Sequence, residues 1–281
     1  MRTVHSAAEL PAREPGRSRA VVMTMGALHE GHLALVRAAR KQADEVLVTI
    51  FVNPLQFNEA ADLERYPRTL DADAALLEPE GVDWIYAPDV EDVYPGGSPV
   101  VTVSAGAIND VFEGAHRPGH FDGVLTVVLK LMHLTRPDLA FFGQKDAQQV
   151  IAIRTMVRDL NVPVGIVVVP TVREPDGLAL SSRNVFLSAD ERADALVLSR
   201  ALSAAAEAAA SGASADAVLA TGRAVLAESL RVIPDYFAAL DPASAQPVAD
   251  DYRGEVVIAV AARVGQTRLI DNIVTTVGGA P

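Results

Sequence analysis

The chain has 281 residues, no cysteine and a formal net charge of −12 at pH 7. This length allows a core that is stable without disulfides, and the lack of cysteine excludes disulfides, thiolate zinc sites and cysteine nucleophiles. The acidity disfavours extended binding to nucleic acid, because the protein would repel the phosphate backbone. No signal-peptide pattern and no run of ~20 apolar residues occurs, so we expect a cytoplasmic protein with no membrane partner.

The first part of the sequence alternates short apolar runs with longer helical patterns. The apolar runs, rich in β-branched residues, predict strands at 20–24, 45–52, 82–88, 138–143 and 164–170. The patterns between them predict helices at 31–43, 69–80, 122–135 and 146–160. Mostly continuous apolar strands are typical of a parallel sheet that is covered on both faces. We therefore expect residues 1–171 to form a Rossmann-like, doubly wound α/β domain that binds ligands beyond the carboxyl ends of its strands.

Residues 172–281 show a different pattern, which predicts a smaller α+β domain. The sequence SADE (188–191) has the form of a capping box and opens an alanine-rich helix, which Gly212 would end. Ser214 can cap a second helix that continues to about Arg231. Three strand-like runs follow, and they suit a small antiparallel sheet. We expect this C-terminal domain to act as a lid.

The stretch MGALHEGHL (25–33) has the two-glycine spacing of a phosphate-binding loop, but two histidines stand where a P-loop uses lysine and a hydroxyl. It joins a strand to a helix, whose free N–H groups and dipole favour a bound phosphate, and Gly31 would let a flat group lie against the backbone. His29 and His32 point the same way on that helix, and the dipole lowers an imidazole pKa, so we expect two neutral N–H donors. The structural alternatives are a capping histidine beside a partly buried one, or a zinc site that would need further ligands.

Other polar groups follow predicted strands or lie in loops. FFGQKD (141–146) places Lys145 just after a buried strand, and Asn53 and Gln56 follow another strand with amides suited to a hydroxy acid. LALSSR (178–183) combines two hydroxyls with a permanent positive charge, which can hold a triphosphate. Taken alone, each of these groups is also compatible with an ordinary surface lysine, an amide turn or a serine-rich linker.

The stretch HEGH resembles the H-x-G-H signature of the nucleotidyltransferase superfamily that includes class I aminoacyl-tRNA synthetases. The closer resemblance is to the pantothenate synthetase (pantoate–β-alanine ligase) family, and it extends over nearly the whole chain. Its motifs occur in the family's order: TMGALHEGH (24–32), IFVNPLQF (50–57), YPRT (66–69), RPGHFDGVLTVV (117–128), FFGQKD (141–146), VREPDGLALSSRN (172–184) and RLIDN (268–272).

The resemblance implies an ATP-dependent ligase of coenzyme A biosynthesis, which joins (R)-pantoate to β-alanine through a pantoyl adenylate and releases AMP and diphosphate. It implies ATP with Mg²⁺ as substrate, no prosthetic group, and a homodimer. The catalytic residues that it implies are His29, His32, Lys145, Ser181, Ser182 and Arg183. The further ATP contacts that it implies are Met25, Gly26, Ala27, Leu28, Glu30, Gly31, Gly143, Gln144, Asp146, Val172 and Leu180. It implies that pantoate or β-alanine is bound by Gln56, Gln149, Asn53 and His120.

The metal ligands stay unassigned, with Asp73 as the candidate, because Ala72 separates it from Asp71 where related sequences carry an acidic group. Two other functions are open at this point. A nucleotidylyltransferase of cofactor synthesis shares the histidine turn, but its acceptor phosphate would call for basic residues where this chain has amides. A catalytically silent nucleotide-binding module would not need the six catalytic groups together. We further expect the histidine pair and Lys145 to meet at the same phosphates.

Overall fold

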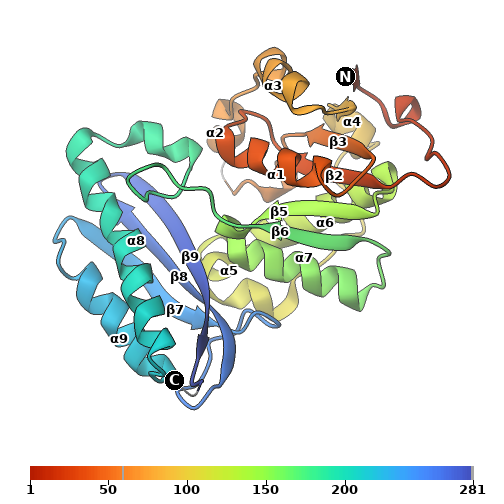
Figure 1. Ribbon diagram of the computed structural model, residues 1–281. Coiled ribbons are helices and arrows are strands. Elements are labelled where there is room, and N and C mark those ends of the chain that lie inside the picture. The colour runs from red at the N-terminus through yellow and green to blue at the C-terminus, as the bar shows by residue number, and fades with distance from the viewer. Residues whose placement is uncertain (59, 280–281) are drawn as a thin grey trace. The chain divides into compact units, whose positions relative to one another are not determined.

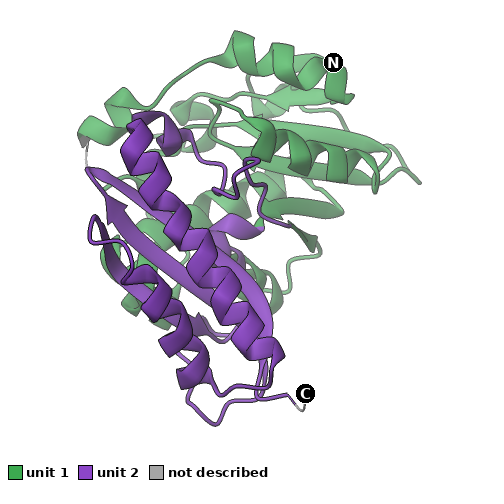
Figure 2. Ribbon diagram, turned by 60° about the vertical axis from the view of Figure 1, so that its left-hand side comes forward, with its two compact units in different colours: residues 1–143, 152–169 green, residues 144–151, 170–281 purple. Residues whose placement is uncertain are grey.

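In the computed structural model, which describes residues 1–58 and 60–279, the chain folds as two units (Figure 2). The first unit contains Met1–Gly143 and Ala152–Val169, and the second contains Gln144–Ile151 and the residues from Pro170 onward. The expected boundary lay between residues 171 and 172. The observed division differs chiefly at residues 144–151, which pack with the later residues and include the start of the helix α7 (Ala147–Asp159).

The first unit is built on a parallel sheet, to which the described residues contribute six strands in the order β1-β4-β3-β2-β5-β6. Figure 1 labels β2, β3, β5 and β6 of this sheet. The strands are β1 (Arg2–Val4), β2 (Arg19–Thr24), β3 (Glu45–Ile50), β4 (Trp84–Tyr86), β5 (Leu139–Gly143) and β6 (Gly165–Val169). The predicted α/β class and parallel sheet are confirmed. Strand β1 was not predicted, because it has only three residues and forms by pairing with β4 at the edge of the sheet.

Helices cover both faces of this sheet. They are α1 (Glu30–Arg40), α2 (Ala60–Arg65), α3 (Leu70–Leu77), α4 (Val90–Val93), α5 (Phe112–His116), α6 (His120–Thr135) and α7 (Ala147–Asp159). The crossovers through α1 and α3 run in one direction along the sheet, and the crossover through α6 from β4 to β5 runs in the other. Right-handed crossovers therefore place α1 and α3 on the opposite face from α6, as a doubly wound fold requires.

The central strands are buried on both faces, which explains their continuous apolar sequences. Val22 and Val48 pack in one cluster with Val36 of α1. Val21 and Leu47 point to the other face and are also 0% exposed. Because all these strands are parallel, their carboxyl ends share one edge of the sheet, and the segments that follow β2 and β3 leave from that edge.

The second unit contains an antiparallel sheet in the order β7-β8-β9, formed by β7 (Val232–Leu240), β8 (Gly254–Val264) and β9 (Thr267–Val277). The helices α8 (Ala189–Ala210) and α9 (Ala215–Leu226) pack on it and share one apolar cluster with it (Figure 1). The predicted capping box is present, since the Glu191 amide donates to Ser188 Oγ at 3.3 Å and the Ser188 amide donates to Glu191 Oε2 at 2.8 Å. Helix α9 ends five residues earlier than predicted, because the chain turns there to enter β7.

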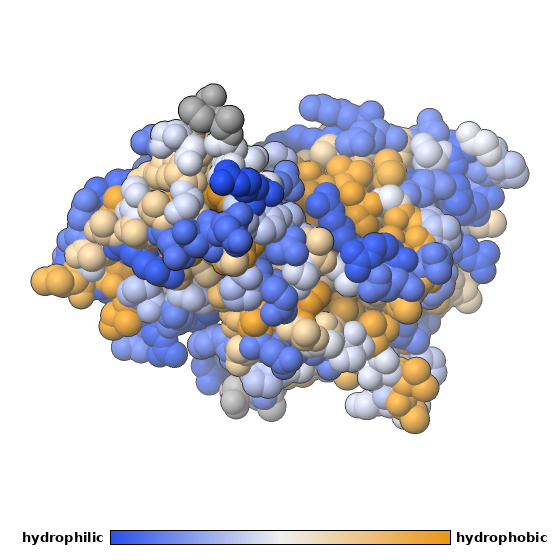
Figure 3. Space-filling model, turned by 90° about the horizontal axis from the view of Figure 1, so that it is seen from below, coloured by the Kyte–Doolittle hydropathy of each residue, from blue (hydrophilic) through white to orange (hydrophobic). Residues whose placement is uncertain are grey.

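Hydrophilic residues cover most of the face seen in Figure 3, and hydrophobic residues form separate patches between them. This distribution accords with the acidic composition of the chain. No helix in residues 1–58 and 60–279 combines the length and the apolar character that crossing a membrane requires.

Candidate active site

The turn after β2 is shaped by two residues in the left-handed region of backbone space. Gly26 has φ +83° and Ala27 has φ +50°. A Cβ atom on Gly26 would lie 3.0 Å from Asp73 Oδ2 and 3.2 Å from Ile50 Cγ2, so the position has room only for glycine. For Ala27 this conformation is uncommon and costs free energy, which the surrounding structure must supply. The turn leads the chain directly from the strand into the N-terminus of α1.

His29 and His32 use one ring nitrogen each to cap helix α1. The Gly31 amide donates to Nδ1 of His29 at 3.1 Å, and the His29 amide donates to Nδ1 of His32 at 3.3 Å. An Nδ1 atom that accepts a hydrogen bond carries no proton, so both rings have the neutral form with the proton on Nε2. The ring centroids are 4.2 Å apart. The Nε2–H groups are therefore the donors that the two rings can offer to a phosphate at this helix end.

The packing of the His29 ring is enough to explain why residue 31 is a glycine, without any contact to a nucleotide. A Cβ atom at this position would lie 2.9 Å from Cε1 of His29. A side chain there would push the capping ring away from the helix. Helix capping was the structural alternative for His29 and His32. The capping bonds also fix the tautomer with the proton on Nε2, which donation to a phosphate requires.

Asp73 stabilises this turn by accepting hydrogen bonds from its backbone. Its carboxylate is 1% exposed and accepts the amide of Leu28 at 2.8 Å, the amide of Ala27 at 3.1 Å and the hydroxyl of Thr69 at 3.2 Å. These contacts explain how Ala27 is kept in its strained conformation, because its N–H points into a fixed acceptor.

Asp73 was the candidate metal ligand, and that assignment stays a prediction. Both of its oxygens already accept hydrogen bonds from the protein. Over the described part of the chain, no group of three or more His, Asp or Glu side chains could hold a metal ion. A metal ion bound at Asp73 would therefore need most of its ligands from substrate phosphates or water.

Asn53 has a supporting position at the end of β3. It is 1% exposed, and its Oδ1 accepts the amide of Leu55 at 3.3 Å and the hydroxyl of Tyr94 at 2.9 Å. Its Nδ2 donates to Gln56 Oε1 at 3.0 Å and to the Gly123 carbonyl at 3.1 Å. These four bonds fill the capacity of one amide. Direct contact of Asn53 with substrate stays a prediction, and it would require one of these bonds to break.

Gln56 is the amide that these contacts orient. Its Nε2 approaches the Met25 sulfur at 3.1 Å, so it lies against the turn that carries the histidines. His120, at the start of α6 and 6% exposed, binds the Gln56 carbonyl through Nδ1 at 3.0 Å and meets Nη1 of Arg117 through Nε2 at 3.0 Å. Arginine can only donate, so Nδ1 of His120 carries the proton. The ring supports the Gln56 turn, and its predicted contact with substrate stays untested.

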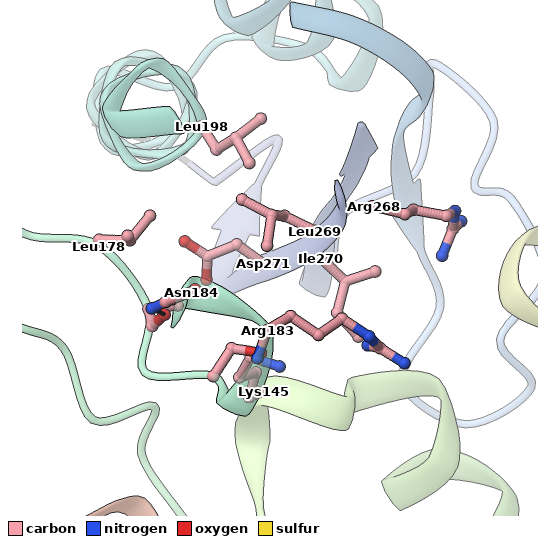
Figure 4. Close-up of a pocket in the computed structure, with 11 residues that line it drawn as sticks. Lys145, Leu178, Arg183, Asn184, Leu198, Arg268, Leu269, Ile270 and Asp271 are labelled. Atoms are coloured by element: carbon pink, nitrogen blue, oxygen red, sulfur yellow. Dashed lines mark hydrogen bonds between the residues drawn. The ribbon is translucent and has the colours of Figure 1, made fainter. Parts of the chain in front are cut away.

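In the second unit, Lys145 lies in a 3₁₀ turn, Gln144–Asp146, and lines a cavity together with Ser181 and Arg183 (Figure 4). Ser181 Oγ accepts the Arg183 amide at 3.2 Å and so caps the short turn that carries the arginine. Within the described residues, neither the Lys145 ammonium nor the Arg183 guanidinium takes part in an ion pair. Two cations and a hydroxyl at one cavity form a site suited to an anion.

The loop that delivers Ser181 is a short hairpin. The Leu180 amide donates to the Val172 carbonyl at 2.9 Å, which closes its base. Glu174 accepts Asn184 Nδ2 at 2.9 Å and Arg192 Nη2 at 2.7 Å, so the loop is bound both to the following turn and to helix α8. Residue spacing did not reveal Glu174 or Arg192. The charged residues of VREPDG (172–177) were the available signal for Glu174, and Arg192 lies outside that motif.

The remaining predicted residues lie at less specific positions. Gly143 ends β5, and Asp146 and Ser182 are exposed. Glu30 is exposed and forms an ion pair with Arg37. Gln149 lies on α7, one helical turn beyond Lys145. The structure therefore brings the predicted residues together in two groups, one in each unit. That the two groups act on one ATP molecule stays a prediction.

The family model described as pantoate-beta-alanine ligase matches residues 1–274. The chain belongs to the pantoate–β-alanine ligase family. A pantothenate synthetase of Streptomyces avermitilis is 51% identical over 99% of this chain and 98% of its own length. A pantothenate synthetase of Thermobifida fusca is 55% identical over 96% of this chain and 94% of its own. The family therefore spans both units of the chain.

Solved structures of the pantoate–β-alanine ligase family share this architecture. The pantothenate synthetase of Thermus thermophilus superposes with a TM-score of 0.89 at 49% identity, covering 97% of this chain and 99% of that one. A pantoate-beta-alanine ligase from Francisella tularensis, solved in complex with beta-gamma ATP and β-alanine, superposes with a TM-score of 0.76 at 31% identity, covering 97% of each chain. The sequence resemblance and the fold thus identify the same family.

Proposed function

We propose that this chain joins pantoate to β-alanine at the expense of ATP, forming pantothenate, AMP and diphosphate. Family membership over residues 1–274 supports the reaction, and the family member from Francisella tularensis was solved with an ATP ligand and β-alanine. The observation that carries the proposal is the histidine turn. It fixes two neutral imidazoles at a helix N-terminus, where the backbone already favours phosphate.

The chemistry that we propose has two steps. A pantoate carboxylate oxygen attacks the α-phosphorus of ATP, and the bond from that phosphorus to the bridging oxygen breaks, so diphosphate leaves. The β-alanine amine then attacks the acyl carbon, the bond to the AMP oxygen breaks, and the amine loses a proton. Neither step needs a nucleophile from the protein. The protein contributes orientation and charge stabilisation.

The roles of the side chains follow from the groups that they present. We assign the Nε2–H groups of His29 and His32 to the phosphates. His32 donates its proton to the oxygen of the departing diphosphate. Lys145 stabilises the α-phosphate, and the Ser181–Arg183 turn holds the diphosphate. Gln56, held by Asn53, binds pantoate. Mg²⁺ enters as the complex of ATP, whose phosphates supply oxygen ligands of the kind that this ion prefers.

Pyrophosphate exchange into ATP tests the reaction against its rival. A ligase requires pantoate for this exchange, whereas a nucleotidylyltransferase requires a phosphorylated acceptor. AMP release should then depend on both pantoate and β-alanine. Exchange that proceeds with a phosphorylated acceptor and ignores pantoate would overturn the proposed function.

Two substitutions test the assigned residues. His32→Ala and Lys145→Ala should each slow pantoate-dependent exchange by about 10² or more, the usual cost of losing one preorganised donor. The controls are His133→Ala and Lys41→Ala, which remove the same side chains from exposed positions on α6 and at the end of α1. A variant at residue 32 or 145 with the turnover of its control would remove that residue from the mechanism.

We also propose that the enzyme is a homodimer, as the family resemblance implies. Light scattering coupled to size-exclusion chromatography measures the mass directly. A mass of about 59 kDa, twice that of a single 29.7 kDa chain, is the expected result, and a mass equal to one chain would contradict it.

A further inference from the structure

Two adjacent residues of β9, Asp271 and Asn272, are buried polar groups of the RLIDN motif. They are 4% and 3% exposed. Successive side chains of a strand point to opposite faces of the sheet, so these two reach different neighbours. Leu269, on the same face as Asp271, points toward Leu198 of α8 (Figure 4). The pair therefore connects two segments of the second unit that are far apart in the sequence.

Asp271 binds the base of the hairpin that carries the serines. Its Oδ2 accepts Nη1 of Arg173 at 2.6 Å, and its Oδ1 accepts Nη2 of the same guanidinium at 3.0 Å. Such a two-bond pair fixes orientation as well as distance. Arg173 Nη1 also donates to the Gly177 carbonyl at 3.1 Å, so the arginine ties β9 to both ends of the hairpin turn.

Asn272 binds the turn that carries Lys145. Its Nδ2 donates to the carbonyls of Gln144 and Lys145, both at 2.9 Å, and its Oδ1 accepts Gln144 Nε2 at 3.1 Å. The amide of Asn272 itself donates to Asp271 Oδ1 at 2.8 Å, which links the two residues directly. The backbone of Lys145 is thus held by a side chain 127 residues away.

A flexible side chain acts at a defined point only when its backbone is held. Lysine carries its ammonium on a flexible four-carbon stem, so the points that the ammonium can reach are set by the position of its backbone. Misplacement of a catalytic group by about 1 Å can cost 10²-fold in rate. The cavity shared by Lys145, Ser181 and Arg183 is assembled from two loops, and β9 is the rigid element to which both are bonded.

Asp271 lines the same cavity as Lys145 and Arg183. A bare carboxylate there would repel a bound phosphate. Its two oxygens face the Arg173 guanidinium, so its charge is balanced locally and the cavity keeps its net positive character. The ion pair is therefore compatible with an anion site, whereas an unpaired acid would oppose it.

We propose that Asp271 and Asn272 are positioning residues that hold the Lys145 turn and the Ser181–Arg183 loop in one fixed relation for adenylate formation. The inference rests on the roles given above to Lys145 and the loop. Neither positioning residue contacts the reacting atoms. They act through backbone carbonyls and through Arg173.

The principal test is Asn272→Asp, which keeps the shape of the side chain and removes both donors to the carbonyls. We expect pantoate-dependent pyrophosphate exchange to lose about 10- to 100-fold in kcat, with a smaller change in KM for ATP. The second step, measured with supplied pantoyl adenylate and β-alanine, should change much less. Asn272→Ser keeps one hydroxyl donor and should show a smaller loss, and it serves as the measured variant if the aspartate prevents folding. Asn161→Asp adds the same charge at an exposed position as the control.

Two double-variant cycles identify the route of the effect. If Asn272 acts through Lys145, Asn272→Asp should cost little more in a Lys145→Ala background. If Asp271 acts through Arg173, Asp271→Asn and Arg173→Met should show the same loss alone and together. Wild-type exchange in Asn272→Asp, or an equal loss in both half-reactions with full additivity, overturns the inference. Failure of the proposed function looks different, because the unaltered chain would then show no pantoate-dependent exchange.

Discussion

Replacing Asp73 by asparagine should destabilise the histidine turn without changing its shape. The carboxylate accepts two backbone amides, Leu28 at 2.8 Å and Ala27 at 3.1 Å, and is 1% exposed. Asparagine offers one acceptor oxygen and one NH₂ group. One of the two backbone amides will therefore face another donor in a buried place, while Thr69 can turn its hydroxyl to accept.

The magnitude follows from the bonds that are lost. A hydrogen bond to a charged group contributes ~1.5–3 kcal/mol, and an unsatisfied buried donor costs ~1–3 kcal/mol. We expect the free energy of unfolding to fall by about 2–3 kcal/mol, with a decrease in Tm of roughly 4–10 °C. The kcat for adenylate formation should fall as well, because Ala27 leaves its strained conformation and the helix that carries His29 shifts.

The matched control is Asp71→Asn, in the first turn of the same helix but exposed. Both variants lose one negative charge near the helix N-terminus, which is worth ~0.3–1 kcal/mol, so their difference isolates the buried bonds. Thermal unfolding is measured without Mg²⁺, and exchange is measured over a range of Mg²⁺ concentrations. Equal Tm values for the two variants, with a raised Mg²⁺ requirement only in Asp73→Asn, would refute this reasoning and support Asp73 as a metal ligand.

Three other substitutions have definite expectations. Gly123→Ala places a Cβ 2.4 Å from a carbonyl of the turn before Gln56, so KM for pantoate should rise several-fold although alanine usually stabilises a helix by up to ~1 kcal/mol; an unchanged KM contradicts it. Gly222→Ala places a Cβ 2.2 Å from an aromatic ring of β7, so thermal unfolding should show a loss of about 1–3 kcal/mol with activity retained. The hydrogen bond from Arg192 is the main cause of the lowered pKa of Glu174 in the folded protein. As the pH drops below the ordinary value of 4.5, the Glu174 carboxylate is therefore protonated in the unfolded state before it is protonated in the folded state, and the free energy of unfolding falls. Glu174→Gln should make the free energy of unfolding depend less on pH in the acidic range. Urea unfolding at neutral and acidic pH will measure this.

The main sheet could be predicted because its signal is local. Strands such as β2 and β3 are buried on both faces, and this burial appears directly as apolar runs. Strand β1 has three residues and exists through its pairing with β4, so no local pattern announces it. Strand β7 contains Pro234, which has no N–H for pairing. The strand tolerates this residue because it lies at the edge of its sheet and has a register shift there.

The site shows the same division between local and distant information. The histidine turn was predictable because capping depends on residues within one helical turn. The bond from Asp73 to Leu28 spans 45 residues, and that from Asn272 to Gln144 spans 128, so spacing in the sequence could not reveal either. The contact of Asn53 with substrate stays a prediction. The sequence could not reveal that Asn53 also orients Gln56, because an amide that binds a ligand and an amide that orients a neighbour look the same in a sequence.

The choice between acid and amide at the two buried supports follows from what each must hold. Asp73 faces backbone N–H groups, and a carboxylate offers only acceptors, so it satisfies two of them. Asn272 faces two carbonyls, which need donors, and a carboxylate there would repel them. The neutral amide therefore supplies the two donors that the Gln144 and Lys145 carbonyls need, without adding a charge.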